Sequence, residues 1–305
     1  MTGPTTASTL GSALCASGLD WIVPDWPAPA RVGALVTTRF GGVSAGPLTA
    51  MNLGRKGRDD AAALAENRRR LTEFLPSPPV WLDQVHGTVV ATLTREAATL
   101  PAPVADAAVT CERDVVCAIL TADCLPVLFA DRAGVAVGIA HAGWRGLAAG
   151  VLEATIAALS ALGARREDLV AWLGPAIGPG RFEVGADVRD AFCADDHGAT
   201  ACFTQHEPAG PPQGRIPERA ARRYTSVPAG PPQGRMPERA ARRYTSVSAK
   251  WHADLYGLAR RRLTRGGVTR VSGGGCCTFT DEARFFSHRR DPRTGRMAAA
   301  VWLGK

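Results

Sequence analysis

Residues 115–146 read VVCAILTADCLPVLFADRAGVAVGIAHAGWRG, and this stretch decides the fold. It holds three apolar runs of strand length, at 115–120, 125–129 and 135–139. The only turn signal between the second and third runs is DRAG at 131–134, so these runs are predicted to pair as an antiparallel hairpin. If the turn closes symmetrically, with a loop of two or four residues, Cys124 lies directly opposite His141.

Cys124 and His141 are therefore predicted to share a metal site. Opposed residues on antiparallel strands have Cβ atoms about 4.5–5.5 Å apart, and both thiolate and imidazole bind zinc. His86 is the best third ligand, because the following Gly87 permits a tight bend. Each residue alone is more typical of a structural role, but their combination favours a metal site with an open fourth position. Pro126 predicts an edge strand or a bulge, since proline cannot donate to a ladder.

Length and composition predict a single catalytic domain over residues 1–305. Apolar residues make up 46% of the 305, which is ample for a hydrophobic core. No run approaches the ~20 apolar residues of a membrane span. Residues 1–20, expected to be a flexible N-terminus, lack the pattern of a signal peptide. We expect a cytoplasmic protein whose eight cysteines are thiols.

A tandem repeat accounts for most of the net charge of +8. Residues 208–227 recur at 228–247 with one change, Ile216 against Met236. Each copy carries four Arg and one Glu, so the two copies contribute +6 and the rest of the chain +2. We interpret 208–247 as a duplicated basic segment inserted in a surface loop, with binding of an acidic partner as the alternative. The nearly neutral remainder argues against a nucleic-acid partner.

Outside the hairpin, predicted strands and helices alternate. Strands are expected at 32–37, 170–173 and 298–303, and helices at 60–75, 147–162 and 251–263. This order predicts an α/β or α+β fold. The helix at 147–162 follows the segment that starts at His141, so its N-terminus should lie near the metal and favour an anion.

Short motifs are spread along the chain: TTRFGGVS at 37–44, MNLG at 51–54, ENR at 66–68, QVHG at 84–87, ADA at 105–107, DC at 123–124, HAGWRG at 141–146 and FFSHRRD at 285–291. Together they resemble the bacterial multicopper polyphenol oxidase, or laccase-like, family, whose members are also described as peptidoglycan editing factors and purine nucleoside phosphorylases. The resemblance covers nearly all of 30–198 and 250–303. It implies a single-domain, four-layer α/β/β/α sandwich with mixed sheets, and zinc on His86, Cys124 and His141.

The resemblance implies zinc-dependent phosphorolysis of adenosine, inosine, guanosine and methylthioadenosine, and hydrolytic deamination of adenosine. Its partners would be small molecules, a purine nucleoside and phosphate, with no membrane partner and the oligomeric state left open. An alternative within the family is an amidase that removes mis-incorporated L-serine from a nucleotide-linked muramic acid precursor. A third is copper-dependent oxidation of phenols, but six His in the chain leave few ligands for further coppers. A zinc-stabilised binding protein without catalysis is the fourth.

Seven further residues are candidates for the site. Asp123, beside the ligand Cys124, is predicted to orient a ligand or to act as a base. Arg145 is predicted to hold phosphate, because a guanidinium fork matches its oxygens. Candidate substrate-binding residues carry groups suited to phosphate, base or ribose: Arg39, Asn52, Gln84, Ser287 and Arg289.

Overall fold

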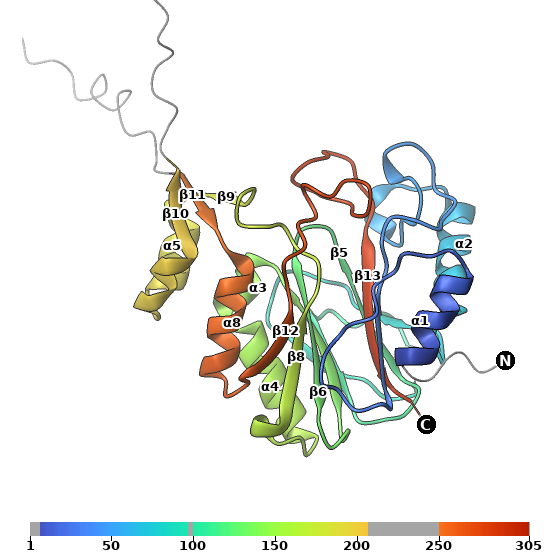
Figure 1. Ribbon diagram of the computed structural model, residues 1–305, viewed down its shortest axis with the longest axis horizontal. Coiled ribbons are helices and arrows are strands. Elements are labelled where there is room, and N and C mark those ends of the chain that lie inside the picture. Colours follow the sequence, from blue (N-terminus) through green and yellow to red (C-terminus); the bar gives the residue numbers. More distant parts are fainter. Residues whose placement is uncertain (1–6, 97–99, 207–249, 305) are drawn as a thin grey trace, which may run out of the picture.

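Two β-sheets packed face to face form the centre of the fold, with helices on both outer sides (Figure 1). The computed structural model describes residues 7–96, 100–206 and 250–304. Within these ranges the four-layer α/β/β/α sandwich implied by the resemblance is confirmed. The repeat at 208–247 lies outside the described residues. No helix in the described part has the length and apolar composition needed to cross a bilayer.

The first sheet has the strand order β1-β13-β5-β2. Its strands are β1 (Val32–Val36), β13 (Met297–Leu303), β5 (Val116–Thr121) and β2 (Val80–Trp81). Helices α1 (Ala7–Ala16) and α2 (Ala61–Thr72) cover its outer face. Residues 1–20 were expected to be flexible, but within α1 the side chains of Leu10 and Leu14 are buried against this sheet. Amphipathic packing therefore orders at least this part of the N-terminal segment.

The second sheet has the strand order β12-β8-β6-β7-β4-β3. Its strands are β12 (Arg270–Gly273), β8 (Leu169–Leu173), β6 (Leu125–Asp131), β7 (Val137–Ala142), β4 (Ala107–Thr110) and β3 (Val90–Thr92). Its outer face is covered by α3 (Trp144–Ala149), α4 (Val151–Ala161) and α8 (Leu255–Arg265), whereas α5 (Ala186–Cys193) packs further out, against α3, β9 and β11. A small sheet of β10 (Phe203–His206), β11 (Lys250–Ala253) and β9 (Glu183–Val184) lies beside α5 (Figure 1).

Both faces of β6 are buried, which explains its unbroken apolar sequence. Val127 and Phe129 pack against the helices, whereas Leu128 and Ala130 pack in the core between the two sheets. A strand buried on both sides has no solvent face and therefore needs no polar alternation. Short 3-10 helices complete the fold at Gly46–Leu48, Arg55–Gly57, Arg166–Asp168 and His197–Cys202.

The predicted hairpin of β6 and β7 exists, but its register differs by two residues. His141 pairs with Pro126 and not with Cys124. Asp131 N donates to Ala136 O at 3.0 Å and closes a loop of residues 132–135. The predicted four-residue loop held residues 131–134, so the observed loop begins one residue later. Successive side chains of a strand point to opposite faces of the sheet. A register shift of two residues therefore leaves each side chain on the face that was predicted. Cys124 lies in the loop just before β6.

The edge strand or bulge predicted from Pro126 is not found. β6 lies between β7 and β8, and its pairing with β7 runs without interruption from Leu125 to Ala130. Pro126 precedes the first pair with β8, Val127 with Leu173, and its carbonyl accepts from Gly174 N at 2.9 Å. A proline is accommodated here because it lies beyond the last ladder pair on that side.

Two predicted helices begin or end elsewhere. The expected helix at 147–162 is divided into α3 and α4 by Gly150, whose φ of 100° is left-handed and breaks the helical run. The expected helix at 251–263 begins only at Leu255, because residues 250–253 form β11 and pair with β10 and β9. The helix predicted at 60–75 is found as α2, with Asp60 accepting from Ala63 N at its start.

Candidate metal centre

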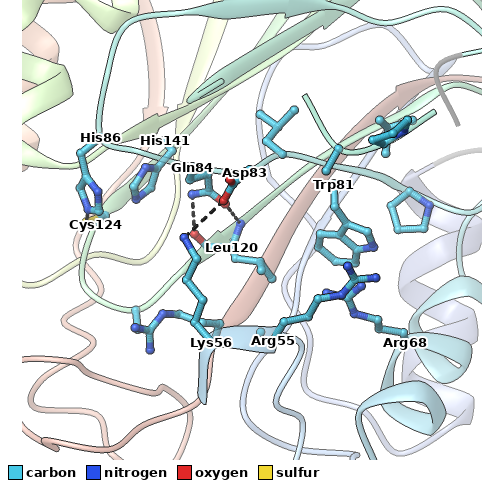
Figure 2. A pocket seen from close by; sticks show the side chains of 18 of the residues that line it. Arg55, Lys56, Arg68, Trp81, Asp83, Gln84, His86, Leu120, Cys124 and His141 are labelled. Carbon is cyan, nitrogen blue, oxygen red and sulfur yellow. Dashed lines mark hydrogen bonds and ion pairs between the residues drawn. The ribbon is translucent and has the colours of Figure 1, made fainter. Parts of the chain in front are cut away.

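His86, Cys124 and His141 meet at one point of the fold, as predicted. One ligand atom from each lies within 4.8 Å of the others, so the group can hold a metal ion. Cys124 Sγ is 3.8 Å from His86 Nε2, and the two imidazole centroids are 4.8 Å apart. Figure 2 shows the three side chains together at one end of a pocket. This set of two nitrogens and one sulfur suits zinc and leaves room for a further ligand.

Three different segments supply these side chains. His141 comes from β7, Cys124 from the loop before β6, and His86 from the turn after β2. The left-handed residue of that turn is His86 itself, with φ of 63°, and not the Gly87 that we expected to bend the chain. A non-glycine residue in this region is strained and is held only where the surroundings determine it.

Asp106 determines that turn, and sequence reasoning did not place it in the site. Its carboxylate accepts from the backbone N–H groups of Val85, His86 and Gly87 at 3.1, 2.9 and 2.6 Å. The same carboxylate is 2.9 Å from His141 Nδ1. This contact leaves Nε2 of His141 for a metal. Asp106 is fully buried and so connects the backbone of one ligand to the side chain of another.

The side chains of the cluster shift one another's pKa values, and this keeps the Cys124 thiol ionised for binding a cation. Burial alone would raise the pKa of the Cys124 thiol, but the charge and hydrogen bond of His141, with those of His86, lower it to about 6. Burial alone would lower the pKa of His141, but the Cys124 thiolate and Asp106 raise it to about 9. Between these values, without metal, Cys124 is a thiolate and His141 an imidazolium.

Zinc binding at pH 7 should therefore release about one proton from this pair, because His141 must lose its proton and Cys124 has mostly lost its own. The number should rise toward two below pH 6 and fall toward zero above pH 9. Titration calorimetry in buffers of different ionisation enthalpy measures it. Zinc binding with no proton release at pH 7 would contradict this charge state.

Gly143 allows the backbone to pass close to the cluster. A Cβ on Gly143 would lie 2.9 Å from Cys124 Sγ and 2.9 Å from His86 Cδ2. We expect Gly143→Ala to weaken zinc binding about 10-fold or more, because overpacking of this kind costs about 1–3 kcal/mol. Gly180→Ala is the matched control, since a Cβ there meets nothing within 4 Å. Equal zinc affinity of the two variants in a chelator competition would refute the prediction.

The cluster opens into a cavity of about 890 Å³. Its polar wall is strongly basic: Arg55, Lys56, Arg68, Arg145 and Arg296 line it, with Asp83 as the one lining carboxylate among the described residues. Trp81, Pro79, Leu100 and Pro101 supply apolar wall. A cavity of this size and charge fits a small anionic ligand, or one that reacts with an anion.

Gln84 and Arg145 are the two residues of the seven that line this cavity. The guanidinium of Arg145, in α3, lies over the ring of Trp144, 4.5 Å from its centroid. Gln84 donates to Leu120 O at 2.9 Å and accepts from Leu120 N at 2.8 Å. Gln84 thus ties the turn that carries His86 to β5, and Arg145 is the better placed of the two to meet a ligand.

Asn52, Ser287 and Arg39 do not line this cavity. Asn52 is fully buried, with Nδ2 donating to Asp59 at 2.8 Å and Oδ1 accepting from Arg296 N at 2.9 Å. Ser287 is fully buried and accepts from Arg290 N. Arg39 lies at a separate cavity of about 460 Å³. None of these three residues therefore reaches the cavity beside the cluster, and their substrate contacts stay predictions.

Asp123 and Arg289 lie beside the cluster and connect it to the C-terminal loop. The Asp123 carboxylate accepts from Thr278 Oγ1 at 2.6 Å and from Arg289 N at 2.6 Å. The guanidinium of Arg289 donates to Glu183 O at 2.8 Å. These contacts agree with an orienting role for Asp123 next to Cys124, and they place Arg289 as a link between loops outside the cavity.

Arg296 and His288 also line the cavity but were not singled out from the sequence. Arg296 is close enough to Cys124 and Asp123 for their charges to raise its pKa, although burial lowers the pKa more. His288 could have been found from its place in the FFSHRRD motif. Asp106 could have been found as a single acidic residue between two alanines at the start of a strand. Arg296 had no distinguishing pattern.

A cluster of three possible metal donors at one end of a basic cavity, carried by an α/β/β/α sandwich, defines the class as an α/β protein that can hold a metal ion. The chain belongs to the family described as multi-copper polyphenol oxidoreductase laccase, whose model matches residues 33–228 and 231–304. The resemblance seen in its motifs is confirmed.

The relatives carry a different activity in their names. The chain is 49% identical to the purine nucleoside phosphorylase PA4543 of Pseudomonas aeruginosa over 283 residues, which cover 93% of this chain and 98% of the relative. It is 45% identical to the purine nucleoside phosphorylase YfiH of Escherichia coli over 284 residues, covering 92% and 98%.

Two solved structures share the fold. Neisseria meningitidis protein NMB0706 is 42% identical with a TM-score of 0.76, covering 94% of this chain and all of the other. YlmD from Geobacillus stearothermophilus is 30% identical with a TM-score of 0.68, covering 90% and 93%.

Proposed function

We propose that this protein is a zinc-dependent purine nucleoside phosphorylase that also deaminates adenosine. The observation that carries the proposal is the His86, Cys124 and His141 cluster at the end of a basic cavity, in a chain 49% identical to a relative named purine nucleoside phosphorylase. The substrate is then a small molecule, a purine nucleoside with phosphate. In phosphorolysis, a phosphate oxygen forms the new bond to C1′ while the bond from C1′ to the purine nitrogen breaks.

The donor set supports zinc as the metal. His86, Cys124 and His141 would hold it, since one thiolate and two imidazoles are ordinary zinc ligands. When bound, zinc supplies a Lewis acid with an open position for substrate or water. The described residues bring together one such group of donors, and this favours single-metal chemistry over oxidation by several coppers.

The residues around the cluster provide binding and orientation. Arg145 and Arg296 line the cavity and carry the positive charge that a phosphate dianion requires. Asp106 and Gln84 hold the turn of His86, and Asp123 holds the loop of Cys124, so the donors keep their places while substrate binds. Leu100, Pro101 and Ala102 form part of the apolar wall of the cavity.

A phosphate-dependence assay tests the proposal. Purified, zinc-loaded protein is incubated with inosine or adenosine, with and without phosphate, and free base, ribose 1-phosphate and inosine are quantified. We expect base release only with phosphate, and conversion of adenosine to inosine without it. Arg145→Gln should raise the KM for phosphate about 10-fold, whereas Arg165→Gln, on the exposed turn before β8, should not.

Two outcomes would reject the proposal. One is the absence of base release from every purine nucleoside by protein with a full complement of zinc. The other is turnover of the muramic acid precursor carrying L-serine without turnover of nucleosides. Copper uptake with oxidation of phenols, tested after growth on copper alone, would reject the choice of metal.

A further inference from the structure

The cavity has two ends with different electrostatics. The cluster lies at one end, and Arg68 and Trp81 lie at the other, with Lys56 between them (Figure 2). Near the cluster, Arg296 has the anionic neighbours Cys124 and Asp123. Among the lysines and arginines that line the cavity in the described part of the chain, Lys56 alone forms an ion pair, with Asp83 at 3.3 Å.

Arg68 is held in place but has no charge partner. Its Nε and Nη2 both donate to Leu53 O, at 3.2 and 2.9 Å, and its guanidinium lies 4.7 Å from the centroid of the Trp81 ring. Nη1 has no hydrogen-bond partner among the described residues. A guanidinium fixed by a carbonyl and an aromatic ring is preorganised, so it loses little freedom when it binds an anion.

Arg55 adds a second positive charge to the same end. Burial and the charge of Arg55 together lower the pKa of Arg68 to about 10, so the two side chains repel each other across a partly buried space. Arg55 follows Gly54, which also lines the cavity, and its own side chain is exposed. Two like charges that converge without a carboxylate are stabilised when an anion binds between them.

We infer that the end of the cavity formed by Arg55, Arg68 and Trp81 is a subsite for a phosphoryl group. Two guanidinium groups match the charge and the oxygens of a phosphate dianion better than those of a single carboxylate. The group can come from a phosphate ester on the substrate or from inorganic phosphate. The inference rests on the proposed function only in the choice of a purine nucleoside as the molecule that carries the phosphoryl group. It assigns this end of the cavity to binding and the end at the cluster to the reaction.

Binding measurements on the zinc-loaded full chain test the subsite without requiring turnover. Adenosine, adenosine 5′-monophosphate and inorganic phosphate are titrated by calorimetry into the wild type, Arg55→Gln, Arg68→Gln and Arg145→Gln. Arg69→Gln is the matched control, since Arg69 lies on the same helix as Arg68 with its side chain 60% exposed and outside the cavity. Arg55→Gln, with an exposed side chain, decides the matter if Arg68→Gln fails to fold.

We expect the monophosphate to bind at least about 10-fold more tightly than adenosine, and Arg55→Gln and Arg68→Gln each to remove about 10-fold of that affinity. Affinity for adenosine and the behaviour of Arg69→Gln should stay unchanged. If only inorganic phosphate responds to the two substitutions, the subsite holds the free anion. The inference is overturned if neither anion responds to them, or if Arg145→Gln alone weakens both. Because only binding is measured, absence of phosphorolysis would reject the proposed function and leave this result standing.

Discussion

Cys124→Ala should lower zinc affinity on the order of 1,000-fold and abolish metal-dependent turnover. Removal of one ligand of three forfeits about 4 kcal/mol of a binding free energy of about 12 kcal/mol, and each 1.4 kcal/mol is tenfold. The thiolate is also the one anionic group among the three donors, so its loss removes the negative charge of the donor set. Zinc per chain by mass spectrometry, and the dissociation constant by chelator competition, measure the effect.

Cys111→Ala is the matched control, because Cys111 is an exposed cysteine outside the cavity. It should bind one zinc per chain with unchanged affinity. Cys124→Ala protein that retained full zinc content and normal affinity would show that this thiol is not a ligand. A folded Cys124→Ala chain, judged by circular dichroism, excludes general unfolding as the cause of zinc loss.

Asp106→Asn should weaken zinc binding about 10- to 100-fold, because the orientation of both imidazoles depends on this carboxylate. One of its oxygens accepts from His86 N and lies against His141 Nδ1, and the other accepts from Val85 N and Gly87 N. An amide keeps the shape but has one acceptor oxygen, so its NH₂ group must face an N–H donor. Loss of these buried contacts should also lower the free energy of unfolding by about 3 kcal/mol.

A spectrum separates orientation from stability for Asp106. In the cobalt(II)-substituted protein, Asp106→Asn should change the ligand-field bands, which report geometry at the metal, at temperatures where the chain is fully folded. Asp190→Asn is the control, since Asp190 is 69% exposed and pairs with Arg189 at the surface, where such pairs contribute little. Identical spectra and identical zinc affinity for Asp106→Asn and wild type would rule out a role in positioning the ligands.

Local patterns predicted the parts of the site that depend on short-range order. The hairpin of β6 and β7 was predicted from two apolar runs around one turn signal, and this placed Cys124 and His141 near each other. Its register was wrong by two residues, since loop closure depends on a contact of Asp131 with Val135 N, made by its side chain at 3.0 Å. Propensities within the turn do not specify such a bond.

Of the five candidate substrate-binding residues, Gln84 alone lines the cavity beside the cluster. Asn52 and Ser287 carry polar groups that suit a ligand, but protein groups already pair with them: Asn52 Oδ1 accepts from Arg296 N, 244 residues away, and Ser287 Oγ accepts from Arg290 N. A sequence shows which side chains can bind, and not whether the fold has already paired them. Arg68 shows the reverse case, since it was not among the candidate site residues, yet it lines the cavity and contacts Leu53 and Trp81.

The sequence by itself determined the class of fold, the family and the three side chains that meet in the cluster, because apolar periodicity and short motifs are local properties of the chain. Only the tertiary structure decided that Asp106 reaches His141, 35 residues away, and that Arg68 and Arg55 meet without a carboxylate between them. Those outcomes follow from which strands and loops pack together. The strength of each charge interaction in the site then depends on how deeply the charges are buried. A local sequence pattern does not specify that burial.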